Sequence, residues 1–275
     1  MNELALALDP EYLELCTEFS LLREELTHLL TQEHELLHVI RPNLLALYQQ
    51  QIGAWEVQCL HAQIEAARAR RRLEMAQAAV NRGKMPNWAE IDGHLELEFL
   101  AWQQQLREAA ERLSAAEHRL KHLMAPDDDR EVKKLYYALV KMLHPDVNPE
   151  LAEDQRRLWL RVQDAYAFKD IGELRALAVL ANESAPVTSS TTETLRRNCG
   201  ALQQQITEME RRIDHLESQP PFPLREQLSD EVWIAERRAE IEARSRQYEA
   251  HRCSLDGALQ ILVKGFPYGQ EFTCN

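Results

Sequence analysis

Apolar residues recur at alternating steps of three and four along most of the chain. The first such seam is Leu15, Phe19, Leu22, Leu26, Leu29, Leu36 and Ile40, with Glu33 as its one defect. This spacing is a heptad repeat, which predicts a long helix that pairs with a partner along one stripe. Because proline cannot continue a helical hydrogen-bond ladder but can open a new one, a break or kink is expected near Arg41-Pro42.

A second seam predicts a helix whose later half is lined with alanine. It consists of Leu45, Tyr48, Ile52, Trp55, Cys59, Ala62, Ala66, Ala69, Leu73, Ala76 and Val80. Small residues let two helices approach closely, so residues 62–76 are expected to have a tight partner. After a short loop at residues 82–87, apolar spacing resumes over residues 95–123. A short loop makes long helices antiparallel neighbours, which predicts a three-helix coiled-coil bundle over residues 1–125.

The heptad pattern returns in the last third of the chain. Its first arm is Leu195, Cys199, Leu202, Ile206, Met209, Ile213 and Leu216, and its second arm repeats Ile234, Ile241, Tyr248, Leu255 and Leu262 at steps of seven. Prolines at residues 220–223 separate the arms, and the second arm restarts near Ser229-Asp230. We therefore predict a coiled-coil hairpin over residues 193–264, a Ser/Thr/Pro-rich linker at 183–192 and a loose tail at 265–275.

The segment between the two heptad regions, residues 126–182, has a different pattern. Within residues 130–143, one predicted helix face carries Val132, Leu135, Tyr136, Leu139, Val140 and Leu143, and the other carries Arg130, Lys133, Lys134 and Lys141. The loop His144-Pro145-Asp146-Val147-Asn148-Pro149 follows, and its two prolines force it out of the helix. A second helix then places Trp159, Val162, Ala165 and Tyr166 on one stripe.

This helix, loop and helix resemble the J-domain family over about residues 128–180. Tyr136 and Leu139 stand eight and five residues before His144, Val140-Lys141 replaces the family's usual Ala-Lys, and the second stripe has the family's core spacing. The resemblance implies a packed core of Tyr136, Leu139, Trp159, Val162, Ala165 and Tyr166. It also implies that a DnaK-type chaperone is contacted by His144, Pro145, Asp146, Lys133, Lys134 and Lys141. The basic helix docks on an acidic surface of that partner, and the loop promotes ATP hydrolysis by the partner's own catalytic groups.

The chain also departs from the family pattern. The usual first-helix signature is absent, so either residues 115–124 supply that packing or the fold is shortened. Tyr137 and Met142 stand where basic residues are common, and no Gly/Phe-rich region or cysteine-rich zinc repeat is present. Read without the resemblance, residues 144–146 are a capped turn between helices, and the three lysines are a solvated helix face.

Composition and charge narrow the function classes. The formal charge of -13 argues against nucleic acid as a main partner, because phosphate neutralisation needs a basic surface. No apolar run is long enough to span a bilayer, and the first residues lack a signal-peptide pattern, so a cytoplasmic protein without a membrane partner is expected. The five cysteines are scattered and never form a C-x-x-C pair, and we expect Cys16, Cys59 and Cys199 to act as small buried hydrophobes.

One motif suggests a different chemistry. Residues 34–38, His-Glu-Leu-Leu-His, match H-E-x-x-H, in which two histidines one helical turn apart hold zinc. No third ligand in a His-x-x-Gly-x-x-His extension and no compact domain accompany it. Both histidines lie outside the heptad seam, so we interpret the match as a solvated helix face and expect no bound metal and no cofactor.

The sequence thus predicts an all-α protein in which long antiparallel coiled-coil helices flank a small central J-like domain. We expect a non-enzymatic co-chaperone whose coiled coils bind a client or scaffold or self-associate. The alternative is a structural coiled-coil adaptor whose J-like segment engages no chaperone.

Overall fold

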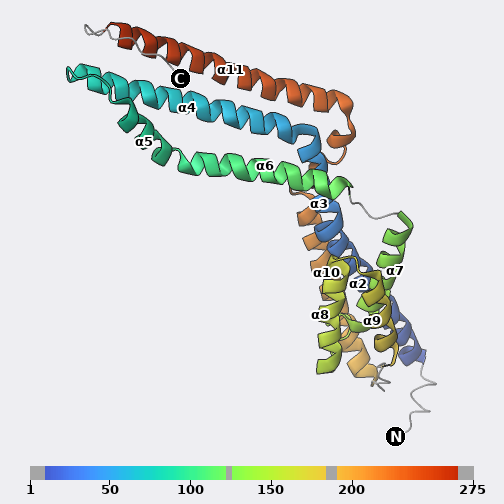
Figure 1. Cartoon of the computed structure of the whole chain (residues 1–275). Coiled ribbons are helices and arrows are strands. Elements are labelled where there is room, and N and C mark those ends of the chain that lie inside the picture. The colour runs from blue at the N-terminus through green and yellow to red at the C-terminus, as the bar shows by residue number, and fades with distance from the viewer. Residues whose placement is uncertain (1–9, 122–125, 184–190, 266–275) are drawn as a thin grey trace. The chain divides into compact units, whose positions relative to one another are not determined.

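The computed structural model describes residues 10–121, 126–183 and 191–265, and every regular element in these ranges is helical (Figure 1). The all-α prediction is therefore confirmed for the described residues. In chain order the helices are α2 (Pro10–Glu35), α3 (Arg41–Tyr48), α4 (Ala54–Asn81), α5 (Trp88–Glu98), α6 (Leu100–Lys121), α7 (Pro126–Leu143), α8 (Glu153–Ala167), α9 (Ile171–Glu183), α10 (Thr192–Glu217) and α11 (Glu231–Lys264). No described helix is long and apolar enough to cross a membrane.

The helices form two compact units that cut across the predicted domain boundaries. Unit 1 takes in Met1–Leu44 and His122–Pro223, and unit 2 takes in Leu45–Lys121 and Leu224–Asn275. The predicted bundle at residues 1–125 is therefore divided between the units, and so is the predicted hairpin at 193–264. Heptad spacing shows that a helix has an apolar stripe but does not say which helix covers it. For this reason the predicted pairing of the two arms of residues 193–264 with each other was wrong.

In unit 1, α2 and α10 lie side by side and run in the same direction (Figure 1). Near their first turns, Leu15 packs with Leu195 and Cys199 in one apolar cluster. Further along, Gln203 donates a hydrogen bond to Glu18 at 3.1 Å. Cys199 is buried, as expected, whereas Cys16 and Cys59 are only partly buried. The helices α7, α8 and α9 pack against one another, and α7 also packs on α2.

In unit 2, α4 has packing partners on two sides. α5 and α6 return antiparallel to it, as predicted, but the helix that runs alongside most of α4 is α11, which is distant in sequence (Figure 1). The central cluster contains Ile64, Ala76, Ile91, Leu95 and Phe99, with Leu259 and Leu262 packed against it. The small residues of α4 thus allow close packing of α11 as well as of the predicted neighbours α5 and α6.

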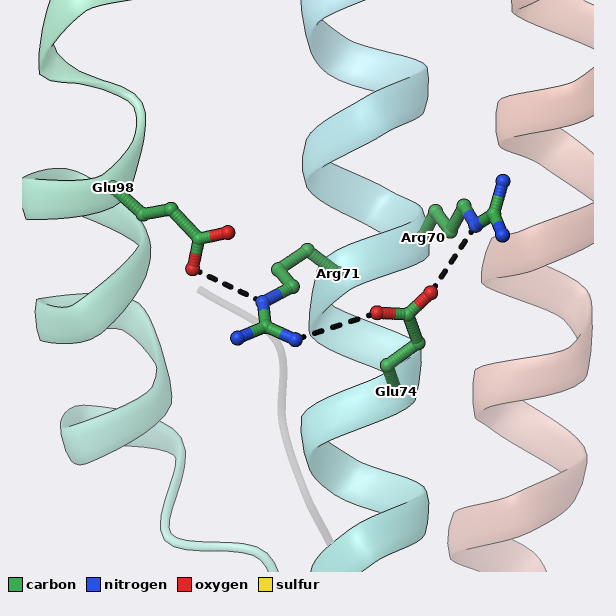
Figure 2. A network of polar contacts seen from close by, with 4 residues as sticks. All are labelled: Arg70, Arg71, Glu74 and Glu98. Atoms are coloured by element: carbon green, nitrogen blue, oxygen red, sulfur yellow. Dashed lines mark hydrogen bonds and ion pairs between the residues drawn. The ribbon is translucent and has the colours of Figure 1, made fainter.

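Ion pairs lie on the surface of unit 2, outside its apolar cluster. Arg71 of α4 donates to Glu98 of α5 at 3.0 Å and lies 3.4 Å from Glu74, as Figure 2 shows. Exposed pairs of this kind contribute at most about 1 kcal/mol each. The apolar cluster therefore supplies most of the stability of unit 2.

The predicted interruption at Pro42 takes the form of a π-helical turn. Residues Leu36–Ile40 are wound with one extra residue, and the N–H of Arg41 donates to the carbonyl of Leu36. The wider turn lets α2 continue into α3 without requiring a donor from Pro42. A second π-helical turn, Gln49–Gly53, leads into α4.

Two helix starts follow local rules, and one of them, the restart near Asp230, was predicted. Proline occupies the first position of α7, where its missing N–H costs nothing. The second arm of the C-terminal heptad region begins after Asp230, whose carboxylate accepts from the N–H of Val232 at 2.9 Å and caps α11. The apolar spacing over residues 95–123 predicted one continuous arm, but α5 ends at Glu98 and α6 begins after Phe99. Most of the predicted linker and nearly all of the predicted tail lie outside the described residues.

Candidate functional site

The His-Pro-Asp segment forms a tight turn between α7 and α8. The N–H of His144 still donates to Val140 at 3.0 Å, and the carbonyl of His144 accepts from Val147 at 3.1 Å and Asn148 at 2.9 Å. The backbone N–H of Asp146 donates to Nδ1 of the His144 ring at 3.1 Å. Since Pro145 also restricts the backbone between them, the imidazole is held against the backbone of Asp146.

The His144 ring rests against the aromatic core of the helix pair. Its centroid lies 4.7 Å from that of Trp159 in an edge-on arrangement. Burial lowers the pKa of His144, the nearby Arg212 lowers it further, and Asp146 partly opposes both effects. Burial thus favours the neutral ring, and Nδ1 is the nitrogen that accepts a hydrogen bond in this turn.

The six predicted core residues are all buried and come together. Leu139 and Val162 are fully buried, and Tyr136, Trp159, Ala165 and Tyr166 are each at most 6% exposed. The ring centroids of Tyr136 and Tyr166 lie 4.0 Å apart, and the Trp159 ring lies on Tyr136 with a centroid distance of 6.0 Å. Leu174 and Leu177 of α9, both fully buried, add to the apolar residues of this group of helices. The stripes on α7 and α8 thus pack as their spacing predicts.

The three predicted contact lysines have different surroundings. Lys133 forms ion pairs with Glu35 of α2 and, at 3.3 Å, with Asp129 of its own helix. The hydrogen bond to Glu35 is the main reason that the pKa of Lys133 is raised. Lys141 lies 3.8 Å from Glu24 of α2. Lys134 is exposed and forms no ion pair within the described part of the chain. Only Lys134 therefore matches the simple solvated face.

Sequence reasoning missed the contribution of α2 to this site. Arg23 donates to the carbonyl of Lys141 at 3.3 Å and to the side chain of Asn148, directly after the His-Pro-Asp turn. His34 places its ring 4.7 Å from Tyr136 and 4.8 Å from Tyr166. One feature of the sequence could have indicated this contact. Arg23 and His34 lie outside the heptad seam of α2, so they can face a helix other than the one that covers the seam.

The interpretation of the H-E-x-x-H motif as a solvated face was wrong for His34. Its Nε2 is buried without a hydrogen-bond partner among the described residues, and its ring packs on the aromatic core. Burial, followed by the nearby His38 and His144, lowers the pKa of His34 to about 4. No group of three potential metal ligands occurs in the described part of the chain. His34 is therefore a packing residue in this structure.

The sequence lacks the first-helix signature of the J-domain family, and in unit 1 the additional helix packed on α7 is α2. α7 packs against α2, α8 and α9, so the N-terminal helix lies where an additional covering helix is needed. Residues 115–121 of α6 belong to unit 2, and residues 122–124 lie outside the described residues. Within unit 1 the additional helix that packs on α7 is α2, and the expectation for residues 115–124 stays a prediction.

A scan against protein-family models and searches of curated proteins and of solved structures found no match to this chain. The function is consequently argued from the residues and their geometry.

Proposed function

We propose that this protein is a cytoplasmic, non-enzymatic co-chaperone that recruits a DnaK-type chaperone and stimulates its ATPase. One observation supports the proposal most directly. The His144-Pro145-Asp146 turn lies at the end of a basic amphipathic helix, and the His144 ring accepts a hydrogen bond from Asp146 and packs on Trp159. A turn of this kind places an imidazole next to a carboxylate-bearing residue on a restrained backbone. The partner supplies the catalytic residues, and this chain supplies a shaped contact.

The long helices give the proposal its second part. The apolar stripes are buried within the helix pairs, so the outer surfaces of the long helices bind a client or scaffold protein, or a second copy of the chain. In this way they bring the recruited chaperone to it. Nucleic acid is a poor candidate for this role because the chain carries a formal charge of -13.

A single-turnover ATPase assay tests the co-chaperone proposal. The purified chain is expected to accelerate ATP hydrolysis by a DnaK-type chaperone from the same source, and Asp146→Asn is expected to abolish the acceleration. Asp154→Asn, at an exposed position in the first turn of α8, is the matched control and should stimulate like the parent chain. Circular dichroism should give the same helix content for all three proteins. Equal stimulation by the parent chain and the Asp146 variant contradicts the proposal. So does the absence of stimulation both by the parent chain and by a variant in which the contact of α2 with Lys133 has been broken.

The second candidate is a structural adaptor that engages no chaperone. The ion pairs of α2 with Lys133 and Lys141 favour it, since they engage the charges that an acidic partner surface needs. The two candidates differ in one measurable respect. An adaptor shows no ATPase stimulation even after this face has been uncovered.

A further inference from the structure

The N-terminal helix α2 runs antiparallel across α7 on the side that carries the paired lysines. Near one end of the contact Glu35 pairs with Lys133, and near the other end Glu24 lies 3.8 Å from Lys141. Between them, Tyr137 is partly buried, and burial together with Glu24 raises its pKa. A row of carboxylates therefore faces the predicted docking face of α7, where an acidic partner surface is expected to bind.

The cover extends to the turn that follows α7. Arg23 reaches both Asn148 and the carbonyl of Lys141, and the Asn148 side chain donates to the same carbonyl at 3.0 Å. α2 thus holds both the lysine face and the residue two positions after Asp146. A partner that contacts this face and this turn together competes with α2 for the same atoms.

Two features make the contact of α2 weaker than its apolar packing alone would make it. The Nε atom of Arg23 and the Nε2 atom of His34 are buried without hydrogen-bond partners among the described residues. A buried polar atom without a partner costs free energy that exposure to water recovers. The ion pairs at Lys133 and Lys141 are partly exposed, so they add little and weaken with salt.

We propose that α2 is an internal occupant of the chaperone-docking face, and that an acidic partner surface binds after displacing it. The protein is then a masked co-chaperone whose activity depends on how tightly α2 is held. The identity of the displacing partner rests on the proposed function, whereas the masking itself does not.

Lysine reactivity measures the masking without any partner. The double variant Glu24→Arg/Glu35→Arg turns both attractions into repulsions, and arginine adds no amine. The matched control, Glu14→Arg/Glu25→Arg, makes the same charge change at exposed positions of α2 that have no ion pair in the described part of the chain. Brief amine acetylation followed by peptide mass spectrometry then reports the labelling rates of Lys133 and Lys141, with the exposed Lys134 as an internal reference.

We expect labelling of the partly buried Lys133, relative to Lys134, to rise about fivefold in the first variant and to stay unchanged in the control. Lys141 is already exposed, so its labelling should rise less. ATPase stimulation by a DnaK-type chaperone should rise with it. If the labelling rises without stimulation, the masking stands and the co-chaperone function fails. If the parent chain stimulates and the first variant changes neither labelling nor stimulation, the function stands and the masking is overturned. Circular dichroism identifies unfolding, and in that case the single variant Glu24→Gln replaces the double variant in both assays.

Discussion

The ring of His34 packs on that of Tyr136, with their centroids 4.7 Å apart, and so joins α2 to the aromatic core formed by α7 and α8. The two residues are more than one hundred positions apart in sequence. Tyr136 is only 2% exposed because this contact, together with Tyr166, covers it. The stability of the candidate site therefore depends on α2.

Removing the His34 ring should destabilise unit 1. His34→Ala is expected to cost about 1 to 3 kcal/mol, because the aromatic contacts are lost and a cavity forms beside Tyr136 and Tyr166. His28→Ala, at an exposed position of the same helix, is the control and should change stability by less than about 0.5 kcal/mol. Urea unfolding followed by circular dichroism measures both, and an unchanged midpoint for the first variant would show that the stacking contributes nothing.

Acid should weaken unit 1 through the same residue. The pKa of His34 is about 4 in the folded protein, whereas a histidine in an unfolded chain titrates near 6.5. Between these values the unfolded chain binds a proton that the folded chain does not, so stability is full above about pH 6.5 and falls as the pH drops towards 4. The loss attributable to His34 is at most about 3 kcal/mol.

The non-titrating variant His34→Phe isolates this effect. It keeps a ring beside Tyr136 but has no proton to bind, so its stability should fall less steeply between pH 7 and pH 5. The burial of His144, whose pKa is also lowered, leaves a smaller dependence of the same sign in the variant. Identical slopes of unfolding free energy against pH in the two proteins would exclude His34 as the source.

The two faces of α7 should respond differently to substitution. Leu139→Ala is expected to cost about 2 to 4 kcal/mol, because Leu139 is fully buried in the core. Lys134→Glu should cost less than about 0.5 kcal/mol, since this lysine is exposed and unpaired in the described structure. Lys133→Glu should lie between them, because it faces Glu35 and Asp129 with a like charge. Thermal unfolding monitored by circular dichroism ranks the three, and a different order would place the buried face elsewhere.

In unit 2, the close contacts of α4 should reject a larger side chain. Ala76 is fully buried beside Ile91, Leu95 and Phe99, so Ala76→Leu is expected to destabilise by about 1 to 3 kcal/mol through overpacking. Ala78→Leu makes the same change at an exposed position two residues later and should be nearly neutral. Calorimetry of the two variants provides the comparison. A neutral effect at Ala76 would mean that the neighbouring helices can move apart.

Sequence periodicity determined much of this protein. Leu139, Val162 and Tyr166 lie in the core as their helical spacing requires, and Pro42 marks an interruption because no proline can complete a helical ladder. Asp230 caps α11 for an equally local reason, since its side chain reaches the free N–H groups of the next residues. Such features depend on neighbours within a turn or two, which a single sequence contains in full.

The pairing of the helices was decided only by the tertiary structure. The apolar stripe of α10 fits the predicted hairpin with α11, yet α10 packs on α2, and α11 packs on α4. Burying an apolar stripe against any complementary stripe lowers the free energy of the folded chain. Which helices pair therefore depends on the packing of all the stripes together. For the same reason the sequence marked Lys133 as a basic residue on a helix face. Only the folded chain could show that Glu35, almost one hundred residues earlier, lies against it.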